Sequence, residues 1–381
     1  MESKELEKLL KKYQHGTCTE EDKQRLFEWY ATYDDLADEL SAIPSRKLDG
    51  IWDSISNEIQ HKSPTRRYFF AARVAAVAIL LIGITTTVHV FLTDSTVDEP
   101  VVADLPIIMP AQGVATLELS TGKTISLESV DQSKDIPSTV AVNNHKQNVL
   151  DYTQTNVKAE TEEMIYNTVR VPVGGEYKLV LADGSKVHLN SCSSLKYPVH
   201  FLGNTREVSL SGEAFFEVSK GSKPFIVKTS DVEIQVHGTS FNVTNYDSEE
   251  DLVTALASGK VTVCDVKHGQ EYDMSPGVAL TYVKSNSCVK SEKVDINEYT
   301  CWTDGVLKFN DMRIEDIMLK LKRWYGYDVT YEDESIKNRR LSGVARKVRP
   351  MNDMLEIMQK VTGLQFAISG TCITVDKKRP V

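Results

Sequence analysis

One apolar segment constrains this chain more than any other feature. Residues 74–92, VAAVAILLIGITTTVHVFL, are nineteen positions without Asp, Glu, Lys or Arg, and eleven of them are Val, Ile, Leu or Phe. Tyr68, Phe69 and Phe70 extend the run at its N-terminal end. A helix needs about twenty such residues to cross the hydrocarbon core of a bilayer. The sequence therefore predicts a single membrane-spanning helix over residues 68–92, with a buried core helix as the alternative interpretation.

The charges beside this run predict its orientation. The twenty residues before Val74 contain four basic side chains, whereas the twenty after Leu92 contain four acidic and no basic ones. Basic residues are enriched on the cytoplasmic side of spanning helices. We therefore expect a single-pass membrane protein with its N-terminus in the cytoplasm and everything after residue 92 on the outer side.

Residues 1–67 are predicted to form a small all-α cytoplasmic domain. Apolar residues recur at helical spacing in three stretches, and Thr19 followed by acidic residues is typical of a helix N-cap. Residues 1–62 contain nine basic and fourteen acidic side chains, which disfavours direct binding to nucleic acid and favours a basic protein partner. The candidate contact residues for that partner, which could instead pack on one another, are Leu6, Leu10, Tyr13, Leu26, Trp29, Tyr30 and Trp52.

The outer region shows the two-residue alternation of β-strands. Tyr177, Leu179 and Leu181 alternate with polar residues, a turn follows at residues 182–185, and the alternation then resumes, which predicts a hairpin. Residues 117–127 have the same spacing and predict a related hairpin. Further strands are expected at 206–210, 214–218, 225–228, 232–236, 241–246, 252–257 and 261–266. We expect a hairpin and linker over 93–165, including a polar connector at 131–163, then an all-β domain over 166–266 and a connector over 267–300.

The C-terminal region repeats one pattern. A strand near residue 306, an amphipathic helix ended by Gly326 and a second strand are followed thirty-seven residues later by another helix, ended by Gly363, and a strand. Both glycines match the residue that ends a helix in the left-handed conformation. Two strand–helix–strand (βαβ) units predict an α+β domain over residues 301–376.

Several motifs resemble the FecR family of transmembrane anti-sigma factors. They are GGE at 174–176, LADGS at 181–185, LN at 189–190, SGEAFFEV at 211–218, PF at 224–225 and GTSFNV at 238–243. The C-terminal repeat is similar to the additional STN-like domain of Bacteroidetes members. The resemblance implies a multidomain chain: an all-α head, one membrane helix, an all-β FecR domain and an α+β domain.

The same resemblance implies a function. The family holds an extracytoplasmic-function sigma factor at the inner membrane through the cytoplasmic head. Its periplasmic part receives a signal from the signalling domain of a TonB-dependent, often SusC-like, outer-membrane transporter. The chain is therefore expected to be an inner-membrane sigma regulator with a periplasmic C-terminus. The alternatives from other classes are a membrane-tethered periplasmic enzyme and a carbohydrate-binding protein.

The residues predict little chemistry. No spacing of His, Cys or acidic residues indicates a metal site, no cofactor motif is present, and the pairing of the six cysteines is left open. We expect no enzyme activity, with one candidate reaction on the chain itself. The Thr239 hydroxyl could attack the Gly238 carbonyl in an acyl shift, because some family members are cleaved at the matching Gly-Thr. The alternative is that Gly238 only forms a bulge between strands.

A basic run near the C-terminus is the second candidate surface. Its candidate docking residues for an acidic signalling domain are Arg339, Arg340, Arg346 and Arg349, accompanied by Lys337 and Lys347. The run is unusual in a chain of net charge −10. A solvated face is the alternative interpretation.

Overall fold

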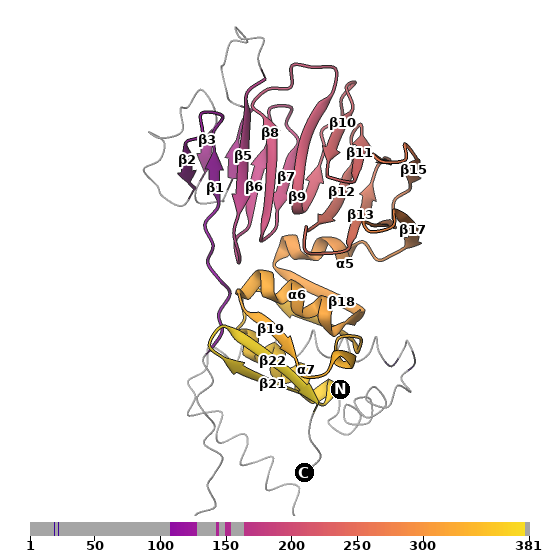
Figure 1. Ribbon diagram of the computed structural model, residues 1–381. Helices are drawn as coiled ribbons and strands as arrows, with labels where there is room; N and C mark the ends of the chain where they lie inside the picture. Colours follow the sequence, from indigo (N-terminus) through magenta and orange to yellow (C-terminus); the bar gives the residue numbers. More distant parts are fainter. Residues whose placement is uncertain are drawn as a thin grey trace, which may run out of the picture. The chain divides into compact units, whose positions relative to one another are not determined.

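The computed structural model describes Thr19, Asp22 and residues 107–127, 142–144, 149–153 and 164–377 (Figure 1). The predicted span at 68–92 lies outside these residues. So do the candidate partner contacts of the head, which are Leu6, Leu10, Tyr13, Leu26, Trp29, Tyr30 and Trp52. Within the part that is described, no helix has both the length and the apolar character needed to cross a bilayer.

The expected N-cap in the head is present at the two residues described there. The Asp22 amide donates to the Thr19 hydroxyl at 3.1 Å, and the Thr19 amide donates to the Asp22 carboxylate at 3.2 Å. These reciprocal bonds are those of a capping box, which satisfies two amide groups at the start of a helix. Asp22 itself is helical, as expected for the first turn of the predicted helix.

The β region consists of two sheets that share the long strand β9 (Figure 1). The first sheet has the order β2–β1–β5–β8–β9–β10–β11–β14–β15. Its strands are β1 Thr116–Glu118, β2 Thr124–Ser126, β5 Tyr166–Val171, β8 Ser193–Pro198, β9 Arg206–Glu217, β10 Phe225–Lys228, β11 Val232–Val236, β14 Val261–Asp265 and β15 Glu271–Met274.

The second sheet has the order β3–β4–β6–β7–β9–β12–β13–β16–β17. Its other strands are β3 Val142–Asn144, β4 Val149–Asp151, β6 Tyr177–Val180, β7 Lys186–Leu189, β12 Ser240–Asn245, β13 Asp251–Ser258, β16 Val278–Val283 and β17 Cys288–Lys293. One apolar core contains residues of both sheets, including Leu117, Ile234, Leu179 and Phe216. We call this two-sheet body the sandwich.

Strand β9 corrects one expectation. The sequence predicts separate strands at 206–210 and 214–218, but β9 is one strand of 12 residues. Gly212 has a φ of +98°, and the strand passes there from the first sheet to the second. A positive φ costs little for glycine, which allows this bend without a turn.

The other predicted strands are confirmed, but the two segments predicted as connectors contain strands. The two hairpins are present as β1–β2 and β6–β7, and the second turns at Gly184 with a φ of +79°. Residues 267–300, expected as a connector, instead form β15, β16 and β17 together with the short helix α5, Asn297–Thr300. Within the expected connector 131–163, β3 and β4 also pair into the second sheet. The body therefore extends beyond residues 166–266.

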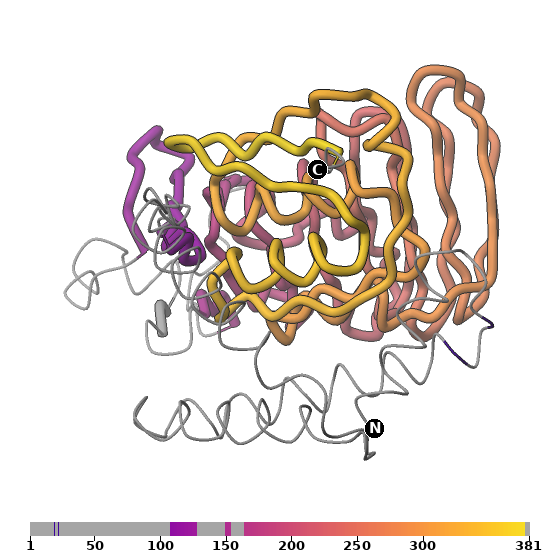
Figure 2. The backbone as a smooth tube through the Cα atoms, turned by 90° about the horizontal axis from the view of Figure 1, so that it is seen from below, coloured from indigo at the N-terminus to yellow at the C-terminus, as the bar shows by residue number. Residues whose placement is uncertain are grey.

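The C-terminal module contains the expected repeat (Figure 1). The 3₁₀ helix η4, Cys301–Asp304, leads into β18 Val306–Arg313, α6 Ile314–Tyr325, β19 Asp328–Tyr331, η5 Glu334–Ile336, β20 Arg340–Arg346, α7 Met351–Thr362, β21 Leu364–Ser369 and β22 Cys372–Lys377. The first strands of the two units, β18 and β20, pair with each other, whereas β19 and β21 both pair with β22. Figure 2 shows β21 and β22 as the two yellow strands running side by side.

Both helices end as the sequence predicts. Gly326 follows α6 with a φ of +79°, and Gly363 follows α7 with a φ of +68°. The apolar stripes of α6 and α7 meet in a separate core, which includes Ile317, Leu321 and Leu355. Among the described residues, the sandwich and the C-terminal module nevertheless belong to one compact unit that starts at residue 107.

Candidate functional site

Arg323 of α6 connects the C-terminal module to the sandwich. Its side chain is only 10% exposed, and its guanidinium donates to the Glu249 carboxylate at 2.5 Å. The guanidinium also lies over the Tyr246 ring, 3.9 Å from the ring centroid. Burial lowers the pKa of Arg323, but the nearby Tyr246, Glu249 and Glu213 outweigh burial and raise it overall. The junction therefore holds a buried cation between groups of the sandwich.

Glu213 of β9 is the centre of a buried hydrogen-bond network beside this cation. Its carboxylate accepts bonds from the Asn190 amide at 2.8 Å, the Asn242 amide at 2.9 Å and the Thr244 hydroxyl at 3.0 Å. The Asn242 carbonyl oxygen in turn accepts a bond from the Trp302 indole of η4 at 3.1 Å. Glu213, Asn190 and Asn242 all lie in the motifs that carry the family resemblance. These motif residues thus face the C-terminal module.

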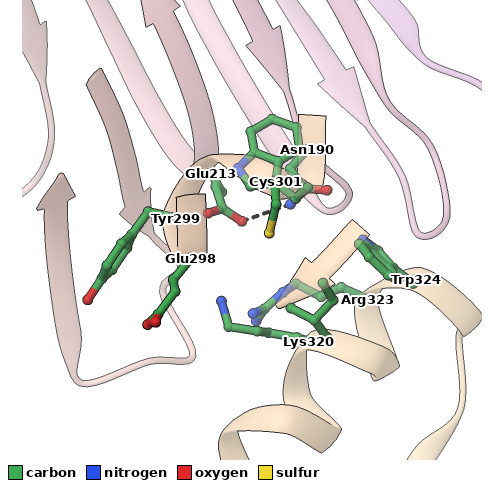
Figure 3. Close-up of a pocket in the computed structure, with 10 residues that line it drawn as sticks. Asn190, Glu213, Glu298, Tyr299, Cys301, Lys320, Arg323 and Trp324 are labelled. Carbon is green, nitrogen blue, oxygen red and sulfur yellow. Dashed lines mark hydrogen bonds between the residues drawn. The ribbon is translucent and has the colours of Figure 1, made fainter. Parts of the chain in front are cut away.

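A small cavity lies at the same junction (Figure 3). Figure 3 shows Lys320 and Arg323 on the helix side and Asn190 and Glu213 on the sandwich side. The cavity holds about 30 Å³, which is room for a water molecule but not for a substrate. It is lined by Asn190, Glu213, Glu298, Tyr299, Cys301, Trp302, Leu307, Lys320, Arg323 and Trp324. The arrangement suits a polar contact between two modules.

A second ionic contact joins the modules. The Glu176 carboxylate accepts from Lys347 of the C-terminal module at 2.6 Å, and its other oxygen lies 3.3 Å from His188 Nε2. Burial raises the pKa of Glu176, but the contacts with His188 and Lys347 outweigh it and lower the pKa overall. The His188 ring packs on Trp302, with 4.8 Å between ring centroids. Glu176 belongs to the GGE motif, so this motif also faces the C-terminal module.

The predicted docking arginines do not form one patch. Arg340 begins β20 and Arg346 ends it, a separation of roughly 20 Å at the rise of a strand. Arg339 donates to the carbonyl of Thr362 at 3.1 Å, and Arg340 donates to the Asp311 carbonyl at 2.5 Å. Arg349 is half-buried beyond the other end of the strand. The basic run is thus divided into two groups, and transporter docking through it stays a prediction.

Gly238 and Thr239 lie between β11 and β12, where the chain passes from the first sheet to the second. The register of β12 against β13 shifts directly afterwards, between Ser240 and Phe241. The buried Thr239 hydroxyl donates to the Lys260 carbonyl at 2.9 Å. An open groove of about 490 Å³ adjoins this peptide and is lined by Lys220, Gly221, Gln235, Val236, His237, Gly238, Thr239, Lys260 and Thr262.

Self-cleavage at this peptide stays a prediction with a direct test. Purified Thr239→Ala is expected to give one full-length band on a denaturing gel, whereas the unmodified chain gives two fragments, because only Thr239 has the hydroxyl adjacent to the scissile carbonyl. Thr262→Ala, a change of the same type in the same groove, serves as the control and should still yield fragments. A single intact band from the unmodified chain would end the hypothesis.

The structure also shows the cysteines and the acidic residues that the sequence offers as candidates for disulfide, hydrolase or metal chemistry. Cys192, Cys264, Cys288, Cys301 and Cys372 are all free thiols. Glu213 and Glu217 occupy one strand, four residues apart, so they are not the opposed carboxylate pair of a glycosidase. In the part of the chain that is described, no group of three or more His, Cys, Asp and Glu is placed to hold a metal ion.

Sequence reasoning missed the residues that join the modules. Arg323 lies opposite the apolar stripe of α6, so a helical pattern assigns it to solvent. Glu249 follows a strand in a run of three acidic residues, which also resembles a solvated loop. The only signal in the sequence is indirect, because Glu176 and Glu213 are charged residues within the motifs that carry the family resemblance.

The described structure thus consists of two modules, a β-sandwich and a strand–helix–strand repeat, which are joined by polar contacts. Two family models match the chain in these two parts: FecR protein over residues 167–262, and FecR, C-terminal, over residues 306–375. These matches identify a FecR domain and a FecR C-terminal domain in the chain, which confirms the resemblance found in the sequence.

Two solved structures are also similar to this chain. Two crystal structures, each described as a candidate anti-sigma factor from Parabacteroides distasonis, match with 27% sequence identity and a TM-score of 0.52. They cover 55% and 56% of this chain, and 98% and 99% of their own chains. A search among curated proteins finds no match. The family and these neighbours support a regulatory rather than an enzymatic role.

Proposed function

We propose that this protein is an inner-membrane anti-sigma factor that relays a periplasmic signal to transcription. Residues 1–67 sequester an extracytoplasmic-function sigma factor in the cytoplasm, and residues 68–92 cross the membrane. The sandwich and the C-terminal module receive the signalling domain of a TonB-dependent, SusC-like transporter in the periplasm. The protein has no direct contact with nucleic acid and needs no cofactor.

One observation carries the proposal: two FecR-family domains follow, in one chain, an apolar run whose flanking charges predict an outer location for everything after it. The acidic balance of residues 1–62 suits a basic partner such as a protein that itself binds DNA. The structural neighbours described as candidate anti-sigma factors add support. The polar junction between the modules fits a signal receiver, because domain contacts of this kind resemble transient interfaces.

Co-purification from the native membrane tests the proposal. The full chain with a C-terminal tag is solubilised in mild detergent, and the captured proteins are identified by mass spectrometry. We expect a sigma factor in near-equal amount, and its loss in a Leu10→Asp, Trp29→Asp double variant, because charges on the apolar stripes of the head would disrupt either its packing or its partner contact. Arg339→Ala, Arg340→Ala on the outer side serves as the control and should retain the sigma factor.

The outcomes also separate the alternatives. A periplasmic enzyme or carbohydrate-binding protein would capture no sigma factor, and its activity would not depend on the head. A reporter fused at the C-terminus should be active only in the periplasm, because the predicted orientation places that end outside. A cytoplasmic signal from that fusion would overturn the proposed relay.

A further inference from the structure

Residues 107–113, which we call the strap, lie directly before β1 and contact the C-terminal module. The Ile108 side chain is 1% exposed and belongs to the core of that module, although the rest of the core comes from residues 302–375. Its neighbours Ile107 and Met109 are 72% and 55% exposed. One side chain of the strap is therefore buried in a module that follows almost two hundred residues later.

Backbone bonds fix the same residue to the start of α7. The Ile108 amide donates to the Asn352 side-chain oxygen at 2.7 Å, and the Ile108 carbonyl accepts from the Met351 amide at 2.8 Å. Met351 is the first residue of α7, and Pro350 at the N-cap provides no side-chain cap. The strap therefore satisfies an amide that the helix leaves unpaired.

The other end of the strap contacts α6 and the sandwich together. The Ala111 amide donates to the Trp324 carbonyl at 3.0 Å, and the neighbouring Arg323 carbonyl accepts from the Gly174 amide at 2.9 Å. A Cβ atom on Gly174 would lie 1.8 Å from the Ala111 carbonyl oxygen, so the strap and this sandwich turn are in close contact. Only a few residues later, Ala115 and Leu117 are buried in the sandwich core.

We propose that the strap mechanically couples the C-terminal module to the chain that leads back to the predicted span. The span is expected to end at residue 92, which leaves residues 93–106 before the strap. Any partner that displaces the start of α7 or the end of α6 must break the bonds of Ile108 and Ala111. The strap is then released toward its N-terminal side, while β1 stays in the sandwich.

The direction of this signal depends on the proposed function, but the coupling itself does not. The contacts between modules are ionic and hydrogen-bonded around a cavity with room for water, and such contacts separate more readily than an apolar core. Ile108 is the one apolar side chain of the strap that is fully buried, so release removes a single side chain from the core in addition to breaking the bonds of Ile108 and Ala111. Low-stability elements of this kind are those that move in regulated proteins.

Hydrogen exchange on the full chain in detergent micelles tests the coupling. Ile108→Ala should raise the exchange rate of peptides covering residues 351–355 at least about ten-fold, because the first turn of α7 loses its packed anchor. Peptides covering 116–126 should be unaffected. Ile107→Ala removes an exposed side chain of the same type and is the matched control, for which no change is expected in α7.

The reciprocal variant completes the test. Leu355→Ala in α7 should raise exchange at residues 108–111 together with α7, and Leu252→Ala in β13 should not. The proposal is overturned if the strap exchanges with β1 instead of α7, or if Ile108→Ala leaves α7 unchanged. If Leu355→Ala does not fold, the Ile108 variant alone decides. This experiment needs neither a sigma factor nor a transporter, so a negative result rejects the coupling and leaves the proposed function intact. Conversely, if the co-purification experiment captures no sigma factor, the hydrogen-exchange measurement of the coupling remains valid.

Discussion

Replacing Glu213 with alanine is expected to lower the free energy of unfolding by about 3 kcal/mol or more. The Glu213 carboxylate accepts three bonds, and the donors on Asn190, Asn242 and Thr244 are all buried. Each buried donor left without an acceptor costs about 1–3 kcal/mol. Loss of the network therefore outweighs the small gain from burying a methyl group in place of a carboxylate.

Urea denaturation followed by circular dichroism measures this effect. Glu217→Ala is the matched control, because Glu217 is exposed on the same strand and the same face, and its loss should change stability by less than about 0.5 kcal/mol. Glu213→Gln keeps the shape but replaces one acceptor by a donor that meets other donors, so an intermediate loss is expected. Equal midpoints for the Glu213→Ala and Glu217→Ala variants would contradict the network's role.

The same variant should loosen the junction. The Asn242 side-chain amide donates to Glu213 and its carbonyl oxygen accepts from Trp302, so a change in the Asn242 orientation reaches η4 directly. Arg323 also loses a nearby negative charge, although its bond to Glu249 remains. Glu213 therefore links the stability of the sandwich to the contact between the two modules.

The sequence allowed the hairpins and the C-terminal repeat to be predicted because their burial follows a simple period. In β6 and β7 every second residue is buried, and the turn between them contains a glycine with positive φ. In β17 all six residues are exposed or half-buried, since this strand lies at the edge of its sheet. An edge strand without a buried face has no alternation to detect, which explains why residues 288–293 are assigned to a connector.

The candidate site was predictable only in part, because most of its contacts join segments that lie far apart in the sequence. The motif residues Glu176 and Glu213 were recognised, but their contacts arise from chain segments far away in sequence, such as Lys347 at 171 positions from Glu176. Ile108 is an ordinary apolar residue in a segment without periodicity, so nothing local assigns it to the core of a distant module. Contacts of this kind are determined by tertiary packing, which periodicity does not report.

Gly212→Ala is expected to destabilise the sandwich by about 2–5 kcal/mol. A non-glycine residue with left-handed backbone costs about 1–2 kcal/mol, and overpacking costs about 1–3 kcal/mol. Gly212 has a φ of +98°, and a Cβ there would lie 2.4 Å from Ser193 Oγ and 2.6 Å from Ser193 Cα. Because one of these atoms is backbone, β8 itself must shift.

A matched glycine separates the two causes. Gly277 has a φ of +81° with nothing within 4 Å of its Cβ position, so Gly277→Ala should cost only the backbone strain, about 1–2 kcal/mol. The additional loss in Gly212→Ala then measures the clash with β8 in urea denaturation. The shift also weakens the bond that Ser193 Oγ accepts from the Glu213 amide at 2.8 Å. Similar losses for the two variants would mean that β8 yields without cost, and the bend of β9 would then require glycine for its φ alone.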